Sequence, residues 1–298
     1  MNAIEIRSLS KSYKQRKFAR VITQQALDAI DLSVSEGEAV GFIGPNGAGK
    51  TTTIRVLTGA IRADNGCAQL FGVDVCKPDA RAGLGYAPEN PYLYDYLTPL
   101  ETLTMGCRQH GLKVDNLEKH CMGWLERFDL ATVAKKTIRS FSKGMTQRTA
   151  LAHALAIKPK LLILDEPLSG LDPIGRKDVV DILDDYHKQG GTLFFSSHVL
   201  HDVERLANRF VMIVKGQIAL NTTLADIMQQ SNDYLIRSAG TAPLPGMAQD
   251  SSGSWVLTAH RDVLWEKLAQ LEKAGHTLHD VRAQTSLEHI VMQIGQAR

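Results

Sequence analysis

Apolar residues are spaced along the chain in two ways, and the two spacings alternate. Polar and apolar positions alternate over residues 3–7 and 27–34, which predicts strands with one buried face. Almost unbroken apolar runs predict strands that are buried on both faces, as in the centre of a parallel sheet. These runs cover Ala39–Ile43, Leu161–Leu164, Thr192–Ser196 and Phe210–Val214.

Helical spacing separates these strands. It predicts helices over Thr51–Leu57, 174–189 and 199–207, and a further short strand over 83–87. Strands and helices that alternate in this way form an α/β fold with a parallel sheet.

A helical insertion interrupts the sheet. From Pro99 to about Ile157 the apolar residues keep helical spacing, with Leu103, Trp124 and Leu125 among them. We therefore expect a helical subdomain at about residues 92–158, between two halves of the sheet.

The composition changes after about residue 230, where Ser238–Gly253 is rich in Ser, Gly, Pro and Ala. Beyond it the pattern predicts a small α+β unit, with strands at Trp255–Thr258 and Thr277–Val281 and a helix at Val263–Lys273. A closing helix is expected at Leu287–Ile294. The predicted domains are 1–230 and 231–298.

Composition narrows the class of protein. The chain of 298 residues is long enough for about two domains, and its 44% share of hydrophobic residues supports a substantial core. Lys and Arg number 34 against 32 Asp and Glu, and this balance gives no reason to expect a nucleic-acid partner. The four cysteines lack zinc-ligand spacing, which fits a reducing compartment. No signal-peptide pattern or bilayer-length apolar run is present in the sequence, so any membrane-spanning part belongs to another chain.

A phosphate-binding loop follows the first buried strand. The pattern G-x-x-x-x-G-K-(S/T) is matched by Gly44, Pro45, Asn46, Gly47, Ala48, Gly49, Lys50 and Thr51. Glycines let the backbone amides turn toward a polyphosphate, and the helix that starts near Lys50 adds a positive end. Lys50 supplies a full charge for the β and γ phosphates, and the Thr51 hydroxyl is placed to ligate Mg²⁺. Thr52 belongs to the same nucleotide-binding helix start. The loop predicts that the chain binds a nucleoside triphosphate.

Two acids follow the second buried strand. Asp165 and Glu166 come directly after Leu161–Leu164, and ligands of open α/β sheets bind at the carboxyl ends of the strands. We expect Asp165 to hold Mg²⁺ and Glu166 to orient or deprotonate the attacking water.

The segment Ser140–Arg148 completes a resemblance to the nucleotide-binding subunits of ATP-binding cassette (ABC) transporters. Its sequence, SFSKGMTQR, is similar to the family signature L-S-G-G-Q followed by x-Q-R. Ser142 and Gly144 match the signature, whereas Phe141, Lys143 and Met145 depart from it. The resemblance covers about residues 3–225 and implies the ABC ATPase fold: a P-loop core with an antiparallel β subdomain and a helical insertion.

The resemblance also assigns site residues. It implies that Ser142 and Gly144 contact the ATP bound by an opposite subunit, and that Asp172, in Ser169–Asp172, communicates between two ATP sites. His198 takes the place of the family's switch histidine, which contacts the γ-phosphate and steadies Glu166. Glu89 stands at the position where the family usually has Gln.

Tyr13 takes the place of the family's adenine-stacking ring. The segment between Tyr13 and Leu27 is longer than in many relatives of the family and is interpreted as a basic loop. Phe18, within it, is an alternative stacking residue. The basic loop is either solvated or in contact with lipid headgroups or a partner.

The resemblance implies an ATPase subunit with ATP and Mg²⁺, acting as a homodimer on the cytoplasmic face of the membrane beside a separate permease. Met145 and the ending Thr285–Val291 resemble export-type members. Residues about 90–110, with Tyr92, Tyr94 and Tyr96, are the expected permease surface. The alternative is a non-transport ABC ATPase of the translation or DNA-repair type. Translation factors of the family carry two cassettes in one chain, and its DNA-repair proteins carry long coiled-coil insertions. This chain has one cassette and no heptad run. A kinase or GTPase is a third class, but the sequence carries no N-K-x-D motif.

Overall fold

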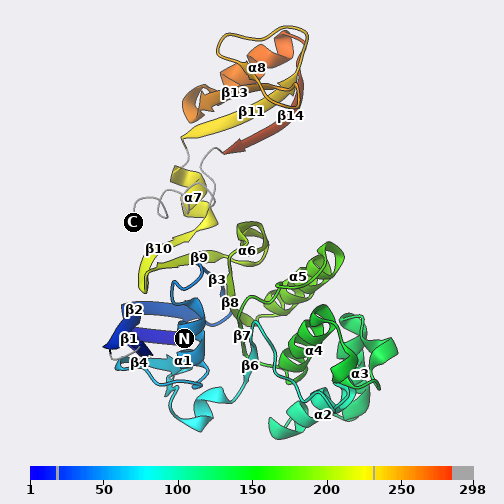
Figure 1. The fold of residues 1–298 in the computed structure, drawn as a ribbon. Coiled ribbons are helices and arrows are strands. Elements are labelled where there is room, and N and C mark those ends of the chain that lie inside the picture. The colour runs from blue at the N-terminus through cyan, green and yellow to red at the C-terminus, as the bar shows by residue number, and fades with distance from the viewer. Residues whose placement is uncertain (18–19, 231, 284–298) are drawn as a thin grey trace. The chain divides into compact units, whose positions relative to one another are not determined.

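The computed structural model describes residues 1–17, 20–230 and 232–283. The chain divides into two units, Met1–Asn221 and Thr222–Arg298 (Figure 1). A six-stranded sheet in the order β10-β9-β3-β8-β7-β6 forms the centre of the first unit. Its strands are β3 (Ala39–Ile43), β6 (Leu84–Ala87), β7 (Leu161–Leu164), β8 (Thr192–Ser197), β9 (Arg209–Val214) and β10 (Gln217–Thr223).

Parallel pairing joins β3 to β8 and β9, and β7 to β6 and β8. Every residue of β3, β7 and β8 is buried, which confirms the interpretation of their apolar runs as central strands. Because parallel strands end at one edge of a sheet, the segments that follow β3, β6, β7 and β8 meet there.

An antiparallel sheet in the order β2-β1-β4-β5 forms a second layer. Its strands are β1 (Asn2–Lys17), β2 (Arg20–Ser35), β4 (Asn65–Leu70) and β5 (Val73–Asp74). The prediction of a loop between Tyr13 and Leu27 was wrong within the described residues. There β1 and β2 remain paired from Lys11↔Leu27 to Lys17↔Arg20. Most residues of this β1–β2 extension are polar, so its sequence lacks the alternation of polar and apolar residues by which a strand is predicted.

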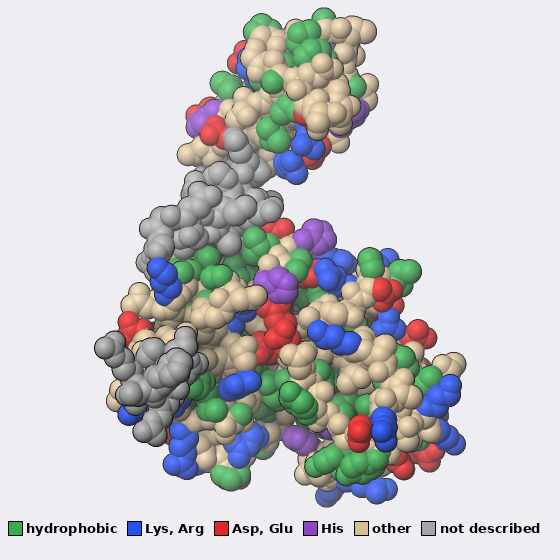
Figure 2. Space-filling model, in the orientation of Figure 1, with side chains coloured by type: hydrophobic (Ala, Val, Ile, Leu, Met, Phe, Trp, Pro, Cys, Tyr) green, Lys and Arg blue, Asp and Glu red, His purple; other side chains and the backbone are tan. Residues whose placement is uncertain are grey.

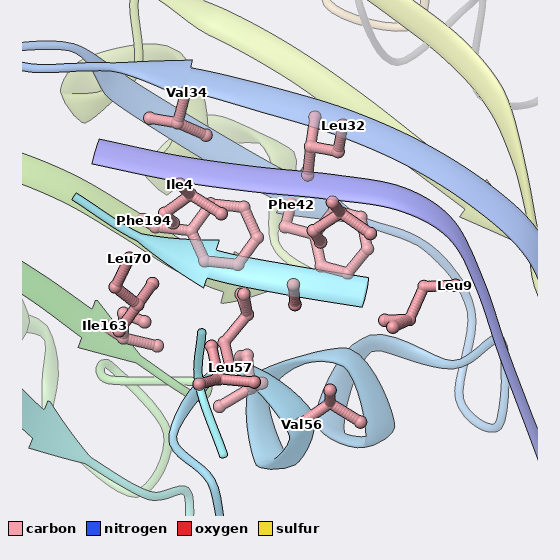
Figure 3. Packing of buried hydrophobic residues seen from close by; sticks show 14 of the residues in the cluster. Ile4, Leu9, Leu32, Val34, Phe42, Val56, Leu57, Leu70, Ile163 and Phe194 are labelled. Atoms are coloured by element: carbon pink, nitrogen blue, oxygen red, sulfur yellow. The ribbon is translucent and has the colours of Figure 1, made fainter. Parts of the chain in front are cut away.

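The main hydrophobic core lies between the two sheets and α1 (Lys50–Leu57), as Figure 3 shows. The rings of Phe42 on β3 and Phe194 on β8 lie 5.3 Å apart between their centroids. Leu57 of α1 packs into the same cluster and is fully buried. This core fixes the helix that follows the phosphate loop against the strand that precedes it.

The remaining helices of the first unit are α2 (Pro99–Gln109), α3 (Leu117–Arg127), α4 (Lys143–Ala156), α5 (Pro173–Lys188) and α6 (Leu200–Leu206). Three short 3₁₀ helices accompany them: η1 (Pro78–Arg81), η2 (Ala131–Val133) and η3 (Ile138–Ser140). The helical pattern predicted from Pro99 onward corresponds to α2, α3 and α4. A reciprocal capping box between Thr98 and Glu101 fixes the start of α2.

The second unit contains a four-stranded sheet in the order β12-β13-β11-β14. Its elements are α7 (Leu224–Gln230), β11 (Asp233–Ala239), β12 (Ala248–Gln249), β13 (Trp255–His260), η4 (Arg261–Val263), α8 (Leu264–Lys273) and β14 (Thr277–Ala283). Ile236, Leu257, Ala259 and Leu271 form its small core. The expected helix and strands at 255–281 are present, but Ser238–Gly253 also contributes to β11 and β12. The helix predicted at Leu287–Ile294 lies outside the described residues.

Arg209 joins both sheets of the first unit. Its guanidinium pairs with Glu38 before β3 and donates hydrogen bonds to the Ser33 carbonyl at 2.6 Å and to Asn221 at 2.8 Å. Burial raises the pKa of the Glu38 carboxyl. The hydrogen bonds from Arg209 and from the Ser35 N–H, together with the charge of Arg209, outweigh burial and leave this pKa below its ordinary value.

We expect Glu38→Gln to lower the free energy of unfolding at neutral pH by about 1–2 kcal/mol. A carboxyl whose pKa is lowered in the fold adds stability above its unfolded-state pKa and loses it as the pH falls through the folded-state value. The difference between wild type and Glu38→Gln should therefore shrink with falling pH below 4.5. Thermal unfolding across this range measures it, with the exposed Glu36→Gln as control. A difference that does not change with pH would contradict the assignment.

Candidate nucleotide site

A cavity of about 450 Å³ lies at the carboxyl edge of the central sheet. Residues 45–47 and 49–52 of the phosphate loop and α1 line it, together with Tyr13, Glu89, Glu166 and His198. Figure 2 shows acidic, basic and histidine side chains gathered beside α6 on this face. The structure thus brings together most of the residues predicted for one nucleotide site.

The phosphate loop takes a backbone conformation that needs glycine. Gly47 has φ 79° and Gly49 has φ 121°. A Cβ atom on Gly49 would also lie 2.7 Å from the Ala26 carbonyl oxygen. Gly49 is the N-cap of α1 and no side chain caps this helix, so its first N–H groups face the loop.

Lys50 is the buried cation of the site, with 6% of its surface exposed. Its Nζ donates a hydrogen bond to the Gly44 carbonyl at 2.6 Å and lies 3.6 Å from Glu166 Oε1. The ammonium group and the amino end of α1 therefore give one wall of the cavity positive charge.

Ser196 holds the two acids in place from the end of β8. Its hydroxyl, fully buried, donates to Asp165 Oδ1 at 2.6 Å and accepts from the Glu166 N–H at 2.9 Å. Glu166 adopts φ 49°, a left-handed conformation that is unusual for a residue with a side chain. Sequence reasoning gave Ser196 no role beyond its place in the strand, because this contact depends on the register of β7 and β8.

Glu166 also contacts His198. His198 Nδ1 lies 2.7 Å from Glu166 Oε2, and the His198 N–H donates to the same oxygen at 3.4 Å. Glu166 is 8% exposed, so its carboxylate sits between the Lys50 ammonium and the imidazole with little water around it. Burial, and then the charge of Asp165, raise the pKa of the nearby Tyr86 above its ordinary value.

Tyr13 is half-buried and lines the cavity, as do its strand partner Gln24 and Ala26. The sequence analysis missed Gln24 and Ala26. Their place in the cavity follows from the continued pairing of β1 with β2, in which Tyr13 pairs with Gln24, and the polar sequence of this segment gave no signal for it. The alternative ring, Phe18, lies outside the described residues.

Ser142, Gly144 and Asp172 do not line this cavity. The Ser142 hydroxyl caps α4 by accepting the Met145 N–H at 3.2 Å. Gly144 lies against the loop before α5, where an added Cβ would be 3.3 Å from the Gly170 carbonyl oxygen. Arg148 of α4 lies 3.5 Å from Asp172, so the signature segment and this loop form a second cluster.

Of the oxygen donors expected for a magnesium ion, Thr51 lines the cavity together with Glu89, whereas the Asp165 carboxylate is 1% exposed, accepts the Ser196 hydroxyl and is not among the lining residues. Within the described ranges, however, no three His, Cys, Asp or Glu side chains gather as a metal site. This donor set fits Mg²⁺, which keeps several waters and takes other ligands from substrate phosphates.

Comparison with known proteins identifies the family. The family model described as ABC transporter matches residues 27–169. The chain is 34% identical to the ABC transporter ATP-binding protein sll0415 of Synechocystis, over 95% of this chain and 76% of that protein. It is 32% identical to the daunorubicin resistance ATP-binding protein DrrA3 of Streptomyces coeruleorubidus, over 94% and 91%.

Solved structures share the fold. The ATP-binding subunit of an ABC transporter superposes with a TM-score of 0.69 at 31% identity, covering 76% of this chain and 92% of that one. A dimeric post-hydrolysis structure of the cassette MJ0796 with ADP and Pi gives 0.68 at 21% identity, covering 74% and 98%, and this likeness shows the fold alone.

The fold and the relatives define a P-loop ATPase. The chain belongs to the ABC transporter family and is its ATP-binding, ATP-hydrolysing subunit. In the part of the chain that the structure describes, no helix has both the length and the apolar character needed to cross a bilayer.

We expect Ser196→Ala to lower the free energy of unfolding of the first unit by about 1–3 kcal/mol, because it leaves a buried carboxylate oxygen and a buried N–H without their partner. Hydrogen exchange of the β7 and β8 amides measures this locally. The exposed Ser140, which donates only to the Thr137 carbonyl, provides the control Ser140→Ala. Equal effects of the two substitutions would show that Ser196 does not hold the acids.

Proposed function

We propose that the chain drives export of a substrate through a separate membrane permease, as a homodimer that encloses two ATP molecules. The main support for this proposal is that the residues predicted to contact ATP lie in two separate places on one chain. The phosphate loop, Glu166 and His198 line one cavity, while Ser142 and Gly144 form a separate cluster with the Asp172 loop.

Within one cavity the chain's residues divide the work. The loop amides from Gly44 to Gly49, Lys50 and the start of α1 at Thr51 and Thr52 bind the phosphates. Glu166 accepts the proton of the attacking water, and His198 holds the Glu166 carboxylate in place. Tyr13 stacks on the base. Thr51 and Asp165, with Glu89 nearby, would hold a Mg²⁺ ion, which would neutralise phosphate charge when bound.

The second copy supplies what one copy lacks. Ser142 starts α4, so its hydroxyl and the Gly144 N–H lie at a positive helix end that suits a phosphate. Because these groups do not line the chain's own cavity, they serve the ATP of a partner, and Asp172 lies beside them to link the two sites. The dimer of MJ0796 with ADP and Pi supports this arrangement by likeness of fold.

An exposed aromatic surface suits the permease. Tyr92, Tyr94 and Tyr96 are 98%, 56% and 68% exposed, between Glu89 and the start of α2. Large aromatic side chains are costly to leave in water and are enriched at the centres of interfaces. Because this surface follows Glu89, which lines the nucleotide cavity, binding of ATP can shift it. The permease would meet the surface on the cytoplasmic face of the membrane. The drug-resistance name of DrrA3 supports export.

We expect Glu166→Gln to reduce ATP turnover by about 10²–10⁴-fold, because Gln cannot accept a proton from the attacking water. Release of phosphate by the full chain measures turnover, and equilibrium binding of ATP confirms that the site is still formed. Glu126→Gln, on the exposed side of α3, is the matched control. Turnover at the wild-type rate would contradict the role given to Glu166.

We expect the double substitution Tyr92→Ala and Tyr96→Ala to abolish co-purification of a multi-span membrane protein with the chain from native membranes. Truncation of a hot-spot residue, a class enriched in Tyr and Trp, weakens binding by about 2 kcal/mol or more, roughly 30-fold. Trp265→Ala is the control, since Trp265 is 80% exposed in the second unit. Co-purification of ribosomes or DNA instead would favour the non-transport alternative.

A further inference from the structure

A second, smaller cavity lies behind the Glu166–His198 pair. Its volume is about 190 Å³, and its walls include Glu166, His198, Ser169, Arg176 and Asp202. None of the roles assigned above involves Arg176 or Asp202. The cavity therefore connects the hydrolytic pair to two charged residues that have no assigned function.

Arg176 and Asp202 form an ion pair with poor hydrogen bonding. Their Nη1 and Oδ2 atoms lie 3.5 Å apart, and the Asp202 side chain is only 6% exposed. Among the described residues, neither Asp202 Oδ2 nor Arg176 Nε has a hydrogen-bond partner. The Arg176 side chain is 37% exposed, but its Nε atom is buried, as is Asp202 Oδ2. Buried polar atoms that lack partners are destabilising, so the native protein must satisfy these two atoms in another way.

Water can satisfy them, because the cavity is polar and large enough. One water needs about 10–15 Å³ of such space and two to four polar partners. The cavity offers Asp202, Arg176 and Glu166 as partners, and its volume of about 190 Å³ accommodates several waters.

The pair also joins two functional loops. Arg176 lies in the first turn of α5, directly after the loop that carries Ser169, Gly170 and Asp172, and its N–H donates to the Asp172 carbonyl at 2.8 Å. Asp202 lies in the first turn of α6, directly after the segment that carries His198. A bridge between these two residues fixes one loop against the other.

We propose that Asp202, together with Arg176, is a positioning residue for ATP hydrolysis. The two side chains hold ordered water in the cavity, and this water network fixes the backbone around His198 and so the His198–Glu166 contact. The inference rests on the hydrolytic role proposed for Glu166. Asp202 and Arg176 do not touch the nucleotide cavity, so they act on the turnover step and leave ATP binding intact.

The test compares two ion pairs between the same helices. Asp181 and Arg205 also join α5 to α6, at 3.4 Å, but the Asp181 side chain is 57% exposed whereas that of Asp202 is 6% exposed. We expect Asp202→Asn and Arg176→Gln each to lower kcat about 10- to 100-fold, the size of effect that a small displacement of a catalytic group produces. The KM for ATP should stay within about twofold. Asp181→Asn should leave both constants unchanged.

Two further variants separate positioning from general damage to the fold. Asp202→Glu keeps the carboxylate and extends it into the cavity, so it should restore most of kcat. The double variant Asp202→Asn with Arg176→Gln should be no slower than the slower single variant, because both substitutions remove one network. A KM that rises together with the fall in kcat, or no rescue by Asp202→Glu, would overturn the positioning role.

A high-resolution crystal structure of the full chain tests the water directly. We expect ordered water about 2.7–3.2 Å from Asp202 Oδ2 and from Arg176 Nε. A cavity closed by side chains, without such water, would overturn the inference even if the variants fail to fold. Glu166→Gln, assayed in parallel, separates the two proposals. If Glu166→Gln loses turnover while the Asp202 variants stay fully active, only the positioning role is refuted. If Glu166→Gln is fully active, the hydrolytic role of Glu166 is refuted.

Discussion

Parallel pairing of β3, β7 and β8 is the constraint on which the site depends. The three strands are buried and adjacent, so the loop after β3, the acids after β7 and the histidine after β8 end at the same edge. None of these groups needs to be near another in sequence. The core beneath them, with Phe42 against Phe194, holds the strands in register and thereby sets the 2.7 Å contact of His198 with Glu166.

Charge and strain are concentrated at that edge and balanced locally. Lys50 and Glu166 are both buried, and each reduces the cost of burying the other. Glu166 also carries a left-handed backbone conformation, of a kind that costs about 1–3 kcal/mol. The hydrogen bond from its N–H to Ser196 keeps the chain in this conformation. A carboxylate fixed in this way is held in one position before any nucleotide arrives, which is the preorganisation that the role proposed for Glu166 requires.

The central strands and the phosphate loop could be predicted from sequence because their signals are local. A strand buried on both faces must be apolar throughout, and Leu161–Leu164 is. The loop from Gly44 to Thr51 has a fixed spacing because glycine is required where the backbone takes positive φ. The residues that line the main cavity were largely among those predicted, and their roles in catalysis stay predictions.

The elements that were missed have weak local signals or depend on distant contacts. β4 begins with the exposed residues Asn65, Gly66 and Cys67, and the β1–β2 extension is polar, so neither shows clear alternation. Gln24, Ser196 and the Asp202–Arg176 pair gain their significance only from partners far along the chain. A single sequence does not report such contacts, since they follow from strand register and helix placement.

The central claim is that one chain holds half of each ATP site and a second copy completes it. Native mass spectrometry of Glu166→Gln with saturating ATP and Mg²⁺ tests this claim most directly, in parallel with the same chain carrying Ser142→Arg as well. The account predicts a dimer with two ATP molecules for the first protein and a monomer with one ATP for the second. A nucleotide-bound monomer in both cases, or a dimer unaffected by Ser142→Arg, would contradict it.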